Sequence, residues 1–165
     1  MTTRTIPTET RVNEQTSEGI NQSIRRQLEA SVYFYAHHPE QIDERLRELE
    51  QEWDIERTLE THAGAVTVAS VVLGLVIRPL RLFPLVVGGF LIQHAVQGWC
   101  PPVPVFRRLG FRTTYEINLE RYALKTLRGD FQDVSYSEDP CSKSAQALDA
   151  VYGDETFYRR RMATE

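Results

Sequence analysis

The chain has 165 residues, of which 41% are hydrophobic and 25% are charged, and its formal net charge is −4 at pH 7. A chain of this length is expected to form one compact unit, or a hairpin with polar extensions. The acidic balance argues against a general nucleic-acid binder, and two cysteines are too few for a disulfide scaffold. The composition therefore points away from nucleic acid as a partner.

The N-terminal part is polar and predicts a leader followed by helices. Residues 1–16 are rich in Thr, Glu and Asn, which is typical of a disordered segment. Residues 17–60 predict an amphipathic helical region, with one helix over 17–37 that Pro39 ends and a second after it. No breaker separates this second helix from the apolar residues that follow. The apolar stripes of the two helices are Ile20, Ile24, Leu28 and Val32, and then Ile42, Leu46, Leu49 and Trp53.

The centre of the chain carries two uncharged apolar runs, Ala63–Ile77 and Leu82–Val96, separated by a short turn. Each run is shorter than the roughly 20 apolar residues that a spanning helix needs, unless flanking residues extend it. The adjacency of the runs favours a transmembrane hairpin over residues 61–113. Small residues at four-residue spacing also favour it, because they let helices approach closely in lipid. These are Ala65, Ala69, Ser70 and Gly74, which are expected to face Gly88 and Gly89.

Positively charged residues predict the orientation of the hairpin. The turn holds only Arg78 and Arg81, whereas six arginines flank the two runs. Such residues are enriched on the cytoplasmic side, so both termini are expected in the cytoplasm. The six are Arg45, Arg47, Arg57, Arg107, Arg108 and Arg112.

Residues after the hairpin predict a cytoplasmic helical tail over 114–165. Three closely spaced prolines, from Pro101 to Pro104, predict a rigid, extended exit that brings Arg107 and Arg108 to the lipid phosphates. Thr113 and Glu116 have the spacing of a capping box at the start of a helix that Gly129 ends. A last helix is expected over residues 144–161.

The segment Gln97-Gly98-Trp99-Cys100-Pro101, after an apolar hairpin and before Leu109–Thr113, resembles the YgaP-like transmembrane domain family of bacterial inner-membrane proteins. The resemblance covers His62 to Thr113, with looser flanks at Trp53–Arg57 and Glu120–Lys125. It implies two short membrane helices in a bacterial inner membrane. Some such domains are fused to a rhodanese sulfurtransferase domain. This chain lacks an alternating βα pattern and a cysteine-headed active-site loop, so sulfurtransferase activity is not implied.

Cys100 is the strongest candidate for chemistry. Neighbouring cations such as Arg107 and Arg108 lower the pKa of a thiol, so Cys100 could handle sulfur or redox equivalents at the membrane surface. The alternative is a small buried residue that packs where the chain leaves the membrane. His62 and His94 are expected near Cys100 in an antiparallel hairpin, and together they could bind a metal ion, although no ligand-spacing motif supports this.

The sequence therefore predicts an all-α protein: a two-helix transmembrane hairpin with amphipathic helical extensions on both sides. The expected function is a non-enzymatic membrane anchor or interaction protein, without a cofactor. Its expected partners are membrane lipid and either a second copy or an unidentified protein. Two alternatives stay open, a thiol site at Cys100 and a soluble helical bundle with a buried hairpin.

Overall fold

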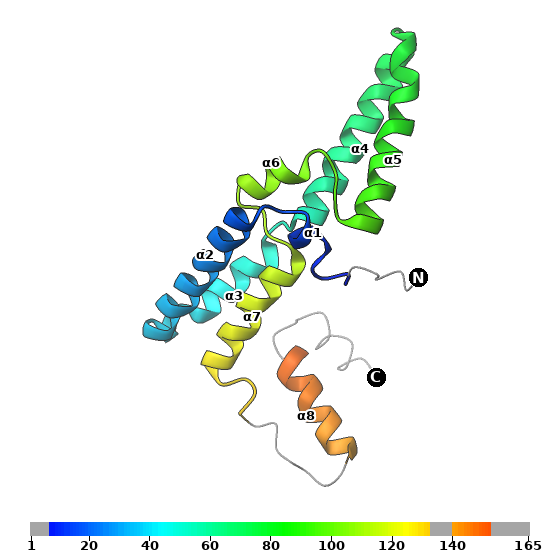
Figure 1. The fold of residues 1–165 in the computed structure, drawn as a ribbon. Helices are drawn as coiled ribbons and strands as arrows, with labels where there is room; N and C mark the ends of the chain where they lie inside the picture. The colour runs from blue at the N-terminus through cyan, green and yellow to red at the C-terminus, as the bar shows by residue number, and fades with distance from the viewer. Residues whose placement is uncertain (1–6, 133–139, 153–165) are drawn as a thin grey trace, which may run out of the picture.

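The computed structural model describes residues 7–132 and 140–152, and within them the fold is all-α, as predicted. Figure 1 shows two parts, which we call the base and the arm. The base consists of α1, α2, α3, α6 and α7, and the arm consists of α4 and α5 with the turn η2 between them. The helix bounds are α1 Arg11–Glu14, α2 Glu18–His37, η1 Pro39–Gln41, α3 Ile42–Gln51, α4 Ile55–Gly74, η2 Arg78–Leu82, α5 Phe83–Gln97, α6 Val103–Arg108, α7 Thr114–Arg128 and α8 Pro140–Tyr152.

The arm begins at a break that the sequence analysis did not predict. Helix α3 ends at Gln51, and α4 starts at Ile55 after Asp54, whose carboxylate accepts a hydrogen bond of 2.7 Å from the Arg57 backbone N–H. An aspartate in this position satisfies one of the unpaired N–H groups of a helix start. The prediction of a helix continuing into the first apolar run is therefore wrong. The break lets α4 leave the base, and α5 returns beside it (Figure 1).

The base has two apolar cores. The first lies where the arm joins the base, and partly buried Phe90 and Leu91 of α5 pack on it. The second lies between α3 and α7, with Tyr35 of α2 against it. The buried members of the first core are Val12, Ile55, Leu59, Cys100, Val103 and Phe106. Those of the second are Ile42, Leu46, Leu49, Ile117 and Leu124.

The segment before α2 is packed into this base. Val12 of α1 is only 1% exposed and belongs to the first core. Gly98, which ends α5 with φ 78°, lies so close to α1 that a Cβ on it would come within 2.4 Å of the Arg11 carbonyl oxygen. The prediction of a disordered leader over residues 1–16 is therefore wrong for residues 7–16. Residues 1–6 lie outside the described part.

The proline-rich segment after α5 forms a helix instead of the predicted extended exit. Pro102 precedes α6 and Pro104 lies in its first turn. Proline is tolerated there because the first N–H groups of a helix have no intrahelical partner. The capping box of Thr113 and Glu116 is confirmed, and so is the end of α7 at Gly129. The predicted last helix begins earlier, at Pro140, and residues beyond 152 lie outside the described part.

The tip of the arm is a tight turn. The Arg81 side chain folds back so that its Nε donates a hydrogen bond of 2.7 Å to the Gly74 carbonyl oxygen. A Cβ on Gly74 would lie 3.0 Å from Arg81, which shows how closely the two ends of the turn approach. Added Cβ atoms on Gly88 or Gly89 would meet nothing within 4 Å. These two glycines therefore do not make the close helix contact that their spacing predicted.

Within residues 7–132 and 140–152, one helical segment, Arg78–Gln97, is long and apolar enough to cross a membrane. Its most apolar window has a mean hydropathy of 1.4, and only 6% of that window is buried. Helix α4 has the same length, but Glu56, Arg57 and Glu60 lie in its first turns. The all-α hairpin is thus present, while a crossing by both helices stays a prediction.

Candidate functional site

Cys100 is the third residue after the end of α5 and is 5% exposed. Burial raises the pKa of its thiol above the ordinary value. Arg107, which was expected to favour the thiolate, directs its guanidinium to Glu116 instead. The surroundings of Cys100 are therefore those of a packed core residue, because a reactive thiolate is favoured by nearby unpaired cations.

His62 and Cys100 line one apolar cleft of about 280 Å³ between α4 and α5. The His62 ring lies 4.9 Å from the Phe106 ring, and its Nδ1 is 3.1 Å from the Thr58 carbonyl oxygen. His94 is buried but does not line this cleft. Among the described residues, no group of three or more His, Cys, Asp or Glu side chains is arranged to hold a metal ion.

A buried ion pair joins α6 to α7 in the base. The Arg107 guanidinium donates two hydrogen bonds to Glu116, with N–O distances of 2.6 and 2.7 Å. Asn13 donates to the same carboxylate, and Asn21 and Thr16 accept from Arg107. Two parallel N–H···O bonds fix the geometry of such a pair. The residues before α2 are thereby tied to both helices.

A second buried carboxylate, Glu120, lies one turn further along α7. It accepts hydrogen bonds from Arg112, from Arg45 of α3 at 2.9 Å and from Ser31 of α2 at 2.6 Å. Arg112 in turn donates to both carboxylate oxygens of Glu52, at 2.7 and 2.5 Å. Glu120 thus connects α2, α3 and α7 through charged hydrogen bonds.

Both buried glutamates are held in the ionised form. Burial alone would raise the pKa of Glu116 and of Glu120, because it disfavours the charged carboxylate. Hydrogen bonds from Arg107 to Glu116, and from Arg45, Ser31 and Arg112 to Glu120, outweigh burial and lower both pKa values below 4.5. We call these two glutamates and their arginine partners Arg45, Arg107 and Arg112 the charged lock.

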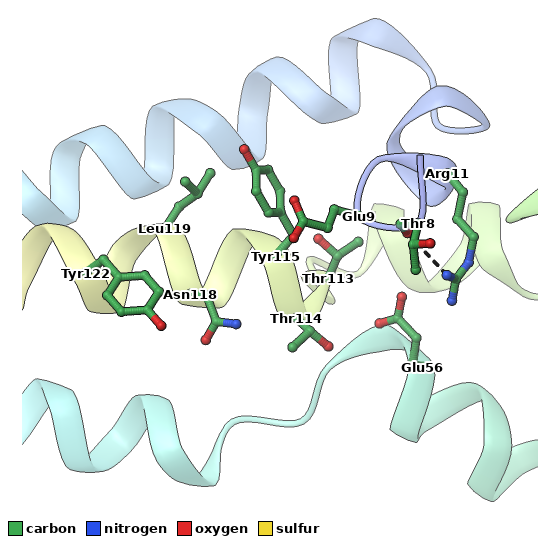
Figure 2. Close-up of a pocket in the computed structure, with 10 residues that line it drawn as sticks. All are labelled: Thr8, Glu9, Arg11, Glu56, Thr113, Thr114, Tyr115, Asn118, Leu119 and Tyr122. Carbon is green, nitrogen blue, oxygen red and sulfur yellow. Dashed lines mark hydrogen bonds between the residues drawn. The ribbon is translucent and has the colours of Figure 1, made fainter. Parts of the chain in front are cut away.

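A cleft of about 410 Å³, lined by both polar and apolar side chains, opens between the residues before α2, the start of α4 and α7. Figure 2 shows Glu56 on one wall and Tyr115 and Tyr122 along α7. Burial raises the pKa of Glu56, and its Oε2 has no hydrogen-bond partner in the described structure. The arrangement can hold water or a small polar molecule.

Large apolar side chains are exposed along both helices of the arm. They are more than 40% exposed on α4, on α5 and in the turn between the two helices. Contiguous apolar patches of this kind are rare on soluble monomers and mark contact with a membrane or a protein. These side chains are Val68, Val71, Val72, Leu73, Leu75, Val76, Ile77, Leu82, Phe83, Leu85, Val86, Ile92 and Val96.

The sequence analysis found the arm but missed the charged lock. Glu116 was recognised for its capping box alone, and Glu120 was not singled out. A usable signal was their four-residue spacing together with Arg107 and Arg112 just before α7. Comparisons with protein-family models, with curated proteins and with solved structures gave no match.

Proposed function

We propose that this chain is a small integral membrane protein and a non-enzymatic anchor. Its arm inserts into the bacterial inner membrane as a two-pass hairpin, and its base stays in the cytoplasm with both termini. The exposed apolar surface of α4 and α5 carries this proposal. The resemblance of residues 62–113 to YgaP-like transmembrane domains agrees with it.

Energetics support insertion of the arm. Exposed apolar area costs about 25 cal/mol per Å² in water, and lipid removes that cost without any change of fold. The base does not require these side chains, because its two cores and the charged lock are complete without the outer part of the arm. The arm is therefore free to contact lipid while the base keeps its own packing.

Aromatic and arginine side chains support a membrane–water interface at the foot of the arm. Arg57 lies over the Trp53 ring at 4.3 Å, at the foot of α4. Trp99 packs edge-on against Phe90 at 6.3 Å, at the foot of α5. Tryptophans and arginines at this level suit a membrane–water interface.

In this proposal, a protein partner or a second copy binds to the base. Tyr33 and Phe34 are exposed at the end of α2 furthest from the arm, where His37 and His38 pack on their rings. Pull-down of the detergent-solubilised protein should yield a partner or a dimer. The pair of substitutions Tyr33→Ser and Phe34→Ser should lose it, with Arg25→Gln on the same helix as the control. A strict monomer with no partner contradicts the interaction role.

An alkaline carbonate wash of isolated membranes tests the anchor. Wild-type protein should stay in the pellet, and Val72→Asp should move it to the supernatant, because a carboxylate in the hydrocarbon layer costs about 2.5–3.5 kcal/mol. Leu127→Asp is the matched control, since Leu127 is 44% exposed on the base and Val72 is 58% exposed on the arm. Release of the wild-type protein would favour the soluble helical bundle instead.

A further inference from the structure

Helix α5 alone is shorter than an average bilayer is thick, although the whole candidate span Arg78–Gln97 has 20 residues. Helix α5 has 15 residues, which at the usual rise span about 22 Å. The hydrocarbon layer of a typical bilayer is about 30 Å thick. Helix α5 is fixed to the base, because Phe90 and Leu91 in its middle pack on the first core and Gly98 at its end lies against α1. The arm therefore cannot slide outward to make up the difference.

The tip of the arm carries positive charge. Arg78 and Arg81 lie in the turn η2 and both are exposed. No acidic residue lies in this turn or in the adjoining helix α5. Arg81 is partly engaged, since its Nε donates to the Gly74 carbonyl oxygen. Arginine side chains near the end of a short membrane helix extend toward lipid phosphates.

We propose that the tip arginines bind phospholipid phosphates of the far leaflet, and that the arm is matched to a bilayer thinner than average. This inference rests on the proposed insertion of the arm. A hydrophobic segment that is too short thins the bilayer around it, at a modest cost for each ångström of mismatch. Bound phosphates at Arg78 and Arg81 draw the far leaflet toward the tip and offset that cost.

Flotation of the full-length protein with reconstituted vesicles tests the bilayer match. The vesicles contain dimyristoleoyl, dioleoyl or dierucoyl phosphatidylcholine, which differ in thickness alone. We expect several-fold more protein to float with the dimyristoleoyl vesicles than with the dierucoyl vesicles. Equal flotation with all three overturns the match while leaving the anchor proposal intact. Absence of flotation with every vesicle contradicts the anchor and this inference together.

Vesicles of a galactosyl diacylglycerol with the same acyl chains, which lacks a phosphate group, test whether the tip arginines bind the lipid phosphate. Wild-type protein should float several-fold better with phosphatidylcholine than with the galactolipid. Arg78→Gln should reduce that difference, because Arg81 remains at the tip, and Arg25→Gln on α2 should keep it in full. An unchanged difference in Arg78→Gln overturns the phosphate contact. Added inorganic phosphate should not restore flotation with the galactolipid, and restoration would mean that the tip binds free phosphate.

Discussion

Arg107 and Glu116 form a buried, bidentate ion pair that joins α6 to α7, with N–O distances of 2.6 and 2.7 Å. Asn13 and Asn21 bond to the same two side chains, so one contact holds residues from four segments of the base. A buried charge without its partner is strongly destabilising. The integrity of the base is therefore expected to depend on this pair.

Replacement of Glu116 by glutamine tests that dependence. Glutamine keeps the capping geometry but removes the charge, which leaves Arg107 buried without a counter-charge. We expect a loss of about 3–5 kcal/mol in the free energy of unfolding. Urea unfolding of the detergent-solubilised protein, followed by circular dichroism, measures it. Glu48→Gln, at the exposed pair with Arg45, should cost at most about 1 kcal/mol. Equal losses in the two variants would contradict a special role for the buried pair.

Acid should destabilise the base through Glu116 and Glu120. Their pKa values in the folded protein lie below the unfolded value of 4.5, so their contribution is complete above that pH. It is lost progressively as the pH falls below 4.5, because protonation then accompanies unfolding. The free energy of unfolding measured at a series of pH values checks this. Below pH 4.5, the free energy of unfolding should fall less steeply with pH in Glu116→Gln than in the wild type. An unchanged slope would show that other groups cause the loss of stability in acid.

Gly98 and Gly110 form a matched pair for testing how α1 is held. Both have positive φ, 78° and 93°, so alanine is strained at either position by about 1–2 kcal/mol. Only at Gly98 would the new Cβ collide with the Arg11 backbone, since nothing lies within 4 Å at Gly110. Gly98→Ala should therefore destabilise clearly more than Gly110→Ala and expose α1 to protease. Similar unfolding curves for the two variants would contradict this packing.

The two cysteines should differ in alkylation rate. Cys141 is exposed on α8, whereas Cys100 is buried and burial raises the pKa of its thiol. Maleimide at neutral pH should label Cys141 rapidly and Cys100 slowly, with mass spectrometry assigning each adduct. The rate at Cys100 should keep rising with pH past the range of an ordinary thiol. Fast labelling of Cys100 below that range would favour the alternative of a membrane-surface thiol site.

Periodicity and caps in the sequence predicted most of the helices, because both depend on local residues. Helix α2 and the start of α7 at Thr113 are examples. Helix α6 was not predicted because its prolines were interpreted as helix-breaking residues, although proline suits the first turn of a helix. The packing of residues 7–16 was missed because it depends on one buried side chain, Val12, and on the space left by Gly98.

The buried face of α7 shows why the charged lock escaped prediction. Leu119 and Tyr122 are apolar residues of α7 that helical periodicity would place inside, yet both are exposed. The buried face instead carries Glu116 and Glu120 with Ile117 and Leu124. Hydrophobic periodicity treats glutamate as a surface residue, whereas hydrogen bonds from arginines make its burial favourable here. Arg107 and Arg112 are close in the sequence and gave a usable signal, but the contacts of Glu120 with Arg45 of α3 and Ser31 of α2 form only in the folded chain.

The accessibility of the arm tip tests the central claim most directly. Leu80→Cys in η2, in a Cys100→Ala and Cys141→Ser background, is labelled with a membrane-impermeant maleimide in intact spheroplasts and in inverted vesicles. Native Cys141 on α8, in a Cys100→Ala background, reports the part of the chain that follows the base. The account predicts tip labelling from the outer side alone and Cys141 labelling from the cytoplasmic side alone. Labelling of both positions from the cytoplasmic side would contradict a hairpin that crosses the membrane.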